Sequence, residues 1–153
     1  MILMNTELVV SSGSVGESNF HIQLTPAYRQ TIFVDPLVRE LTLAYIVQKL
    51  KQHKVKILAF NFGPDHLHLF IANVRWIGEI ELVRQIKGYS SYMMRKGHWD
   101  LFRNKLWGKK FWNEGHFYRS VGMVTKETMT HYIEECQEKH WDKTKEQKSL
   151  IAY

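Results

Sequence analysis

The sequence contains a single cysteine, Cys136, and lacks long apolar segments. One cysteine cannot form a disulfide within the chain, which favours a protein that works in a reducing compartment. No stretch approaches the roughly 18 consecutive apolar residues that a transmembrane helix needs. The first residues, Met1-Ile2-Leu3-Met4, have neither the basic region nor the long apolar region of a secretory signal. We therefore expect a cytoplasmic protein.

The sequence also lacks internal repeats and the glycine-rich loops that cradle nucleotide phosphates. Its length of 153 residues fits one domain with a single core. Residues 11–18 are mostly small and predict a flexible stretch. We accordingly expect a flexible N-terminal extension at residues 1–18, a folded domain at residues 19–141 and a charged tail at residues 142–153.

The charge balance of the chain is basic. Lys and Arg number 21 against 15 Asp and Glu, which gives a net charge of +6, and aromatic residues make up 13% of the chain. Basic surfaces with exposed rings suit single-stranded nucleic acid, because cations track the phosphates and rings stack on the bases. The alternative is a small basic protein whose rings simply fill its core.

Hydrophobic periodicity and turn residues predict a mixture of strands and helices. Asp35 as N-cap and Pro36 at the first helical position predict a helix that reaches about Gln52. A second helix is predicted at residues 79–96, and Thr125 can cap a last one. Strands are expected at residues 20–24, 55–62, 66–72 and 117–121. The resulting β-α-β-β-α-β order is that of an α+β, ferredoxin-like fold, an antiparallel sheet with both main helices on one face.

Apolar residues at helical spacing predict which face each main helix buries. In the first helix they are Leu37, Leu41, Ala44 and Tyr45. In the second helix they are Leu82, Ile86, Tyr89 and Met93. Residues off the second stripe could face a partner, and they are Arg84, Lys87, Ser91 and Arg95. Residues 97–116 are predicted to be rich in loops.

The strand at residues 66–72 carries two histidines in alternation with apolar residues. His66, His68 and Phe70 share one face, and the leucines between them share the other. Two imidazoles placed side by side next to an acid could hold one divalent cation, since histidine is the commonest side-chain metal ligand. The alternative is that both histidines form the wet face of an edge strand. A central position for this strand, as in a ferredoxin-like sheet, would instead place them on the face that carries no helices.

Five short motifs follow one another along the chain. They are Thr25-Pro26-Ala27-Tyr28-Arg29, Gly63-Pro64-Asp65-His66-Leu67-His68-Leu69, Ile86-Lys87-Gly88-Tyr89-Ser90-Ser91, Phe111-Trp112-Asn113-Glu114-Gly115-His116-Phe117 and Tyr132-Ile133-Glu134. In this order they resemble the HUH single-tyrosine transposases of bacterial and archaeal insertion sequences, which include the REP-associated tyrosine transposases. The resemblance runs from about Phe20 to Gln137.

This resemblance implies a metal-dependent transposase that cleaves and rejoins single-stranded DNA with hairpin ends. Tyr132 would be the catalytic nucleophile and form a 5′-phosphotyrosine link, while His66 and His68 would hold Mg²⁺ or Mn²⁺. A free phenol has a pKa near 10 and is a poor nucleophile at neutral pH, so a cation at the phosphate would help the attack. Without the histidines, the favoured interpretation of Tyr132 would be an ordinary tyrosine on a helix surface.

The third metal ligand departs from the pattern of the family. The family usually has glutamine four residues after the tyrosine, and this position is Cys136 here. A thiolate is a poor ligand for hard Mg²⁺. We take Gln137 as the expected ligand, with Glu135 and Cys136 as alternatives. Asp65 is expected to orient an imidazole rather than to bind the metal.

The resemblance further implies DNA-binding residues and a partner chain. Arg84, Lys87 and Arg95 would grip a DNA hairpin along the second helix, together with Tyr28 and Arg29; a solvated basic helix face is the alternative. The tryptophans of residues 97–116 could stack on bases or fill the core. The family works as a homodimer in which the tyrosine helix of one chain often completes the histidine site of the other.

Two other functions remain open at this point. One is a domesticated relative or initiator-type HUH endonuclease that nicks and rejoins hairpins. The other is a non-catalytic ferredoxin-like module that binds RNA or DNA. Such a module typically exposes aromatic residues on its inner strands, whereas the strand at residues 66–72 offers two histidines.

Overall fold

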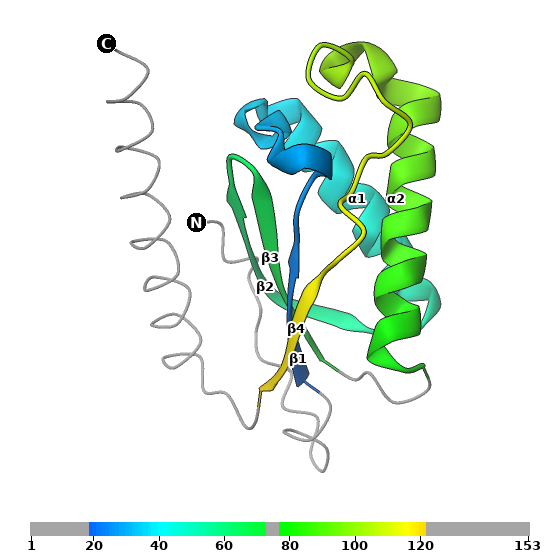
Figure 1. Cartoon of the computed structure of the whole chain (residues 1–153). Helices are drawn as coiled ribbons and strands as arrows, with labels where there is room; N and C mark the ends of the chain where they lie inside the picture. The colour runs from blue at the N-terminus through cyan, green and yellow to red at the C-terminus, as the bar shows by residue number, and fades with distance from the viewer. Residues whose placement is uncertain (1–18, 73–76, 122–153) are drawn as a thin grey trace, which may run out of the picture. The chain divides into compact units, whose positions relative to one another are not determined.

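The computed structural model describes residues 19–72 and 77–121, and Figure 1 shows their arrangement. The elements in chain order are β1 (Asn19–Leu24), the short 3-10 helices η1 (Ala27–Arg29) and η2 (Ile32–Val34), α1 (Pro36–Gln52), β2 (Lys56–Gly63), β3 (His66–Ala72), α2 (Glu79–Phe102) and β4 (Phe117–Val121). The predicted bounds of β3 and β4 are confirmed, and those of β1 and β2 are off by one residue. The predicted last helix, the extension at residues 1–18 and the tail at residues 142–153 lie outside the described residues.

The four strands form one antiparallel sheet in the order β2-β3-β1-β4. The strands β3 and β1 are therefore internal, and α1 and α2 both lie on one side of the sheet (Figure 1). This arrangement confirms the predicted ferredoxin-like α+β fold. Its other face carries no helix among the described residues.

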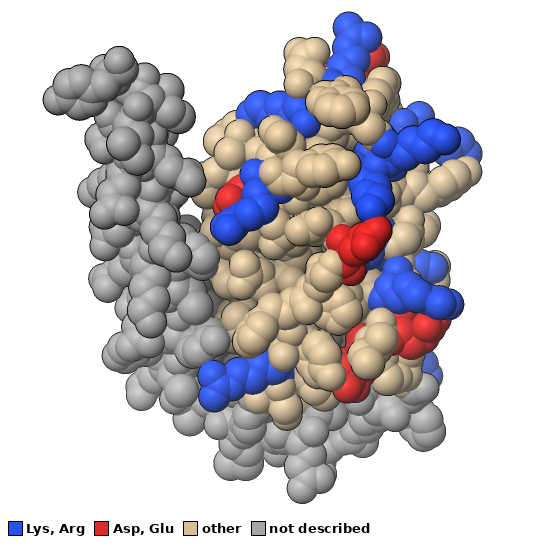
Figure 2. Space-filling model, viewed as in Figure 1, with Lys and Arg blue, Asp and Glu red and all other residues tan. Residues whose placement is uncertain are grey.

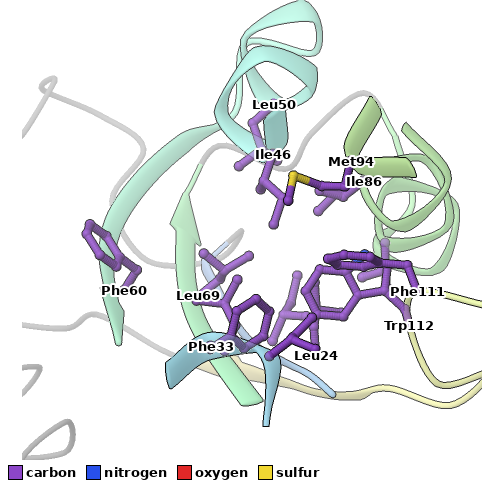
Figure 3. Packing of buried hydrophobic residues seen from close by; sticks show 14 of the residues in the cluster. Leu24, Phe33, Ile46, Leu50, Phe60, Leu69, Ile86, Met94, Phe111 and Trp112 are labelled. Atoms are coloured by element: carbon purple, nitrogen blue, oxygen red, sulfur yellow. The ribbon is translucent and has the colours of Figure 1, made fainter. Parts of the chain in front are cut away.

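The core lies between the sheet and the two helices. Alternating residues of the internal strands point toward the helices, among them Ile22, Leu24, Leu67, Leu69 and Ile71, all fully buried. Figure 3 shows Leu24 and Leu69 facing Ile46 of α1 and Ile86 of α2 across this core. Burial of each such side chain contributes about 1.5–3 kcal/mol, so the helical face of the sheet holds the fold together.

The start of α1 is the predicted one, but its buried face is not. Asp35 Oδ1 accepts a hydrogen bond from the backbone N–H of Leu37 at 2.9 Å, and Pro36 opens the helix. The prediction of the buried face was wrong, because Leu37 is 47% exposed and Ala44 is exposed, while Leu41 and Tyr45 are only half-buried. The residues that α1 buries are Val38, Thr42, Ile46 and Leu50. Apolar residues surround most of this helix, so spacing alone could not select the stripe.

The second helix is longer than predicted. It continues past Lys96 to Phe102, with an irregular residue at His98 (φ −138°, ψ 21°). The ring of Phe102 is buried against Phe111, with 5.3 Å between ring centroids, and this contact holds the extra turn of helix in place. The prediction ended the helix at Lys96 and assigned residues 97–116 to loops, whereas the helix runs on through Gly97 and His98.

The predicted apolar stripe of α2 is only partly correct. Leu82 and Ile86 are fully buried, but Tyr89 and Met93 are half-buried, and Met94 takes the inward position instead. In residues 19–72 and 77–121, neither helix is both long and apolar enough to cross a bilayer.

Thr42 of α1 offers a test of this core. Its hydroxyl is fully buried and has no hydrogen-bond partner among the described residues. An unpaired buried hydroxyl costs about 1–3 kcal/mol, and an apolar group of the same shape removes this cost. We expect Thr42→Val to leave the free energy of unfolding in urea unchanged or to raise it by about 1 kcal/mol.

The matched control is Thr31→Val, because the exposed Thr31 hydroxyl accepts a hydrogen bond from Lys105 Nζ at 3.3 Å. This variant should lose stability slightly, by less than about 1 kcal/mol. A clear loss of stability in Thr42→Val would contradict the unpaired state of that hydroxyl.

Candidate active site

The two histidines of β3 lie on the face of the sheet opposite α1 and α2. His66 and His68 are 2% and 3% exposed, and their ring centroids are 4.9 Å apart at an interplanar angle of 77°. Because β3 pairs with β1 on one side and β2 on the other, it is not an edge strand. The interpretation of the histidines as the wet face of an edge strand is therefore wrong.

Asp65 orients the first of these imidazoles. Its Oδ1 accepts a hydrogen bond from Nδ1 of His66 at 2.9 Å, and its Oδ2 lies 3.4 Å from Nε of Arg29. With Nδ1 engaged by the carboxylate, Nε2 is the nitrogen that His66 would use for a metal. A carboxylate behind a ligating histidine fixes its tautomer and raises its basicity. The contact is the one expected for Asp65.

Gly63 makes room for the His66 ring. The two residues are partners across the β2–β3 hairpin. A Cβ atom at residue 63 would lie 2.6 Å from both Nδ1 and Nε2 of His66, and closer still to Cε1. No side chain fits there while the imidazole keeps its place, so the glycine is required for the position of this ring.

A third histidine, which the sequence reasoning did not single out, adjoins the second imidazole. His21 of β1 is 2% exposed, and its Nε2 lies 2.8 Å from Nδ1 of His68 in a hydrogen bond. Its ring stacks on Phe70 with centroids 4.5 Å apart at 4°. Burial, and then the charge of Arg119, lower the pKa of His21 to about 4, so this ring is neutral at neutral pH. The alternation of β1 could have indicated His21, because it places His21 on the face of the sheet opposite to the one that carries the core residues Ile22 and Leu24.

The residues present fit a divalent cation in part. His66 and His68 each have Nδ1 in a hydrogen bond, so each would offer Nε2, and imidazole is a common ligand for such ions. Within residues 19–72 and 77–121, no group of three or more His, Cys, Asp or Glu could hold a metal. A complete site would need a further ligand from elsewhere. Tyr132 and the three candidate ligands Glu135, Cys136 and Gln137 lie outside the described residues.

The Lys-Gly-x-Ser motif of α2 docks the loop that leads into β4. Lys87 Nζ donates hydrogen bonds to the backbone carbonyls of Asn113, Glu114 and Gly115, at 2.5, 3.1 and 3.3 Å. Burial lowers the pKa of this ammonium group, while Glu114 acts in the opposite direction. The charge of Lys87 is therefore directed at the protein's own backbone.

Ser90 completes the docking of this loop. The buried Trp112 donates a hydrogen bond from its indole Nε1 to Ser90 Oγ at 2.9 Å. The loop also pairs with the segment after β1, because Ala27 N donates to Phe111 O at 2.9 Å and Asn113 N donates to Thr25 O at 2.8 Å. Three motifs far apart in the sequence thus form one structural unit.

Two residues of this unit have unusual backbones. Tyr28 and Arg29 adopt left-handed conformations, with φ of 57° and 51°. Non-glycine residues rarely do so, and such strain tends to persist at functional sites. Here the strained turn is the segment from which Arg29 reaches Asp65, and through Asp65 the His66 ring.

The predicted DNA-binding residues differ in how available they are. The side chain of Arg84 is 79% exposed and pairs with Glu81, Nε to Oε2, at 3.2 Å, while Tyr28 is 74% exposed. Arg95 lies over the Trp99 ring at 5.0 Å, and its Nε and Nη2 are buried with no hydrogen-bond partner in the described part of the chain. Figure 2 shows basic and acidic side chains interspersed along α2 rather than a uniform basic stripe.

The tryptophans divide between the two roles considered for them. Trp112 is 5% exposed and belongs to the core, next to Phe33 and Phe111, whereas Trp107 is 80% exposed. Core packing therefore accounts for Trp112, whereas the ring of Trp107 lies open to solvent and Trp99 is half-buried.

The contact between Gly63 and His66 gives a direct test of the histidine site. In Gly63→Ala the new methyl group must displace the imidazole, so we expect the affinity for Mn²⁺, measured by calorimetry, to fall by about tenfold or more. Gly97→Ala is the matched control, because nothing lies within 4 Å of a Cβ there. Equal Mn²⁺ binding by Gly63→Ala and the wild type would contradict the placement of His66.

Comparisons with known proteins identify the family of the chain. The model of the IS200-like transposase family matches residues 14–136. The ISDra2 transposase TnpA of Deinococcus radiodurans is 24% identical over 139 residues, which cover 90% of this chain and 97% of that protein. The crystal structure of a candidate transposase from Deinococcus radiodurans R1 superimposes with a TM-score of 0.61 at 23% identity, over 80% of this chain and 93% of that one. A REP-associated tyrosine transposase bound to a REP hairpin has the same fold, with a TM-score of 0.51 at 13% identity, over 78% and 64% of the two chains. The chain belongs to the IS200-like transposase family and is a DNA transposase.

Proposed function

We propose that this transposase cleaves and rejoins single-stranded DNA at insertion-sequence ends through a covalent tyrosine intermediate. The observation that carries the proposal is the pair of imidazoles on an internal strand, each oriented through its Nδ1 by a second side chain. Such an arrangement is typical of metal ligands and has no use in a binding module that stacks bases on its sheet.

In this mechanism Tyr132 is the nucleophile. Its phenolic oxygen forms a bond to phosphorus, the bond from phosphorus to the 3′ oxygen breaks, and the strand leaves with a free 3′-hydroxyl. The 5′-phosphotyrosine link conserves the energy of the phosphodiester, and attack by another 3′-hydroxyl rejoins the DNA and releases the phenol. No ATP is consumed in either step.

His66 and His68 are the proposed ligands of Mg²⁺ or Mn²⁺. When bound, the ion would neutralise negative charge that develops at the phosphate. For the third ligand we propose Gln137, with Glu135 and Cys136 as the competing residues. A carboxylate or amide oxygen suits Mg²⁺ better than a thiolate does.

For DNA binding we propose Arg84, Arg95, Tyr28 and Arg29 as direct contacts. Lys87 would act mainly through the loop at residues 111–115 that it docks. Arg95 has two donor nitrogens that are buried and lack acceptors among the described residues, so it would contact a phosphate by turning its guanidinium away from the Trp99 ring. Phosphate oxygens would supply those acceptors.

We further propose a homodimer in which Tyr132 of one chain completes the histidine site of the other, and which works in the cytoplasm.

A gel assay tests the mechanism. Labelled single-stranded element ends are incubated with Mg²⁺ or Mn²⁺ and with wild type, Tyr132→Phe or His66→Ala. We expect a denaturant-resistant protein–DNA adduct that requires the metal and disappears in both variants, since one lacks the nucleophile and the other a ligand. His53→Ala, a histidine that hydrogen bonds to Gln85 at 2.6 Å, serves as the control and should form the adduct. Tight binding of the ends without any adduct would show a binding module and overturn the catalytic proposal.

Salt dependence separates the roles of the basic residues. A side chain that neutralises one phosphate steepens the dependence of log K on log salt by about 0.7–0.9. We expect Arg95→Gln to reduce the slope for hairpin DNA by about this amount, and Arg84→Gln to reduce it less, because Glu81 already offsets its charge. Arg39→Gln on α1 is the control. An unchanged slope in Arg95→Gln, measured by fluorescence anisotropy, would remove Arg95 from the DNA contacts.

A further inference from the structure

The His21–His68 contact is the feature of the site with no role in the mechanism so far. His21 comes from a different strand, yet its Nε2 lies 2.8 Å from Nδ1 of His68. We propose that His21 is a positioning residue, which accepts a hydrogen bond from His68 Nδ1–H and thereby holds His68 in the tautomer and orientation that leave Nε2 to ligate the divalent cation. This inference rests on the proposed function, in which His68 is a metal ligand.

The direction of this hydrogen bond follows from the chemistry of imidazole. One neutral ring must donate and the other accept. If His21 donated from Nε2, His68 would accept at Nδ1 and carry its own proton on Nε2, where it could not bind a metal. If His68 donates from Nδ1, the lone pair of its Nε2 is available to the cation. Only the second arrangement is compatible with a ligand at this position.

The His21 ring is itself held in place by aromatic neighbours. It stacks on Phe70 at 4.5 Å between centroids and contacts the edge of Phe117 at 6.0 Å. These contacts, from β3 and β4, restrict the His21 side chain to one rotamer. In this rotamer its Nε2 points at His68. A pre-oriented acceptor loses little conformational entropy when the hydrogen bond forms.

The two ligands would thus be oriented by groups of different charge. His66 is backed by the carboxylate of Asp65 and His68 by the neutral ring of His21. A neutral acceptor fixes the tautomer as a carboxylate does, but it adds no negative charge close to a site that receives a DNA phosphate. We expect His68 to depend on His21 for its orientation, as His66 depends on Asp65.

Two measurements on the full-length chain test the inference. Long-range ¹H–¹⁵N spectra of the metal-free protein report which nitrogen of His68 carries the proton, with His68→Gln used for assignment. Calorimetry with Mn²⁺ reports the affinity. We expect the proton on Nδ1 in the wild type. His21→Phe keeps an aromatic ring against Phe70 but removes the acceptor, so it should move the proton to Nε2 and weaken Mn²⁺ binding by about 10- to 100-fold.

The second variant separates this role from simple packing. In His21→Gln the side-chain carbonyl can replace Nε2 as acceptor, so it should restore the Nδ1–H form and Mn²⁺ binding close to the wild type. His53→Phe, the same substitution at a half-buried histidine elsewhere, should change neither readout. A proton on Nε2 of His68 in the wild type would overturn the inference, as would wild-type Mn²⁺ affinity in His21→Phe.

Failure of the proposed function would look different. If the wild type binds no Mn²⁺, the metal-dependent mechanism fails, whatever the state of His21. The spectra alone then decide the hydrogen bond: loss of the Nδ1 proton in His21→Phe and its return in His21→Gln support it, and identical spectra overturn it.

Discussion

The pleat of β3 is the constraint on which the rest of the molecule depends. Side chains alternate along this internal strand, so its leucines enter the core while His66 and His68 lie on the opposite face. A slip of one residue in the pairing with β1 or β2 would exchange the two faces and bury the imidazoles under the helices. The energy that fixes the register comes from the apolar face, whereas the proposed metal ligands lie on the other face. Stability and the proposed chemistry thus use the same strand but different side chains.

The register also selects the neighbours of each imidazole. Gly63 pairs with His66 across the hairpin, and Gln23 pairs with His68, which places His21 diagonally next to His68. The space that Gly63 leaves for the His66 ring and the contact of His21 with His68 are thus consequences of strand pairing. In a site built this way, precision comes from the sheet, and the turns that carry Arg29 and Asp65 supply a supporting contact.

The sequence predicted best where a single local rule decides the structure. The alternation of β3 and the cap at Asp35 each depend on a few adjacent residues, and both were confirmed. The buried face of α1 was wrong because apolar residues offer several stripes, and only the sheet selects among them. The end of α2 was wrong because the contact of Phe102 with Phe111 spans a loop.

Long-range contacts also explain what was missed in the candidate site. His21 lies 47 positions from His68, and the alternation of β1 indicates the face of its ring but not the residue that the ring contacts. Similarly, Lys87 was assigned to DNA from its position on the helix, yet the structure directs its ammonium group at three backbone carbonyls. The roles of Tyr132 and of the third ligand stay predictions. Motif and spacing identified which segments matter, but not which of their side chains support one another.

The left-handed turn at Tyr28 and Arg29 has a consequence for how this enzyme could be engineered. Each such residue costs of order 1 kcal/mol or more relative to a relaxed backbone, and glycine would adopt these angles without that cost. Replacement of Arg29 by glycine would therefore relieve strain and also release Asp65 from its partner. The sequence keeps arginine where glycine would fit the backbone better. Selection for thermal stability alone would act against Arg29. A stabilised variant found in that way would be expected to lack the contact that holds the Asp65 carboxylate next to His66.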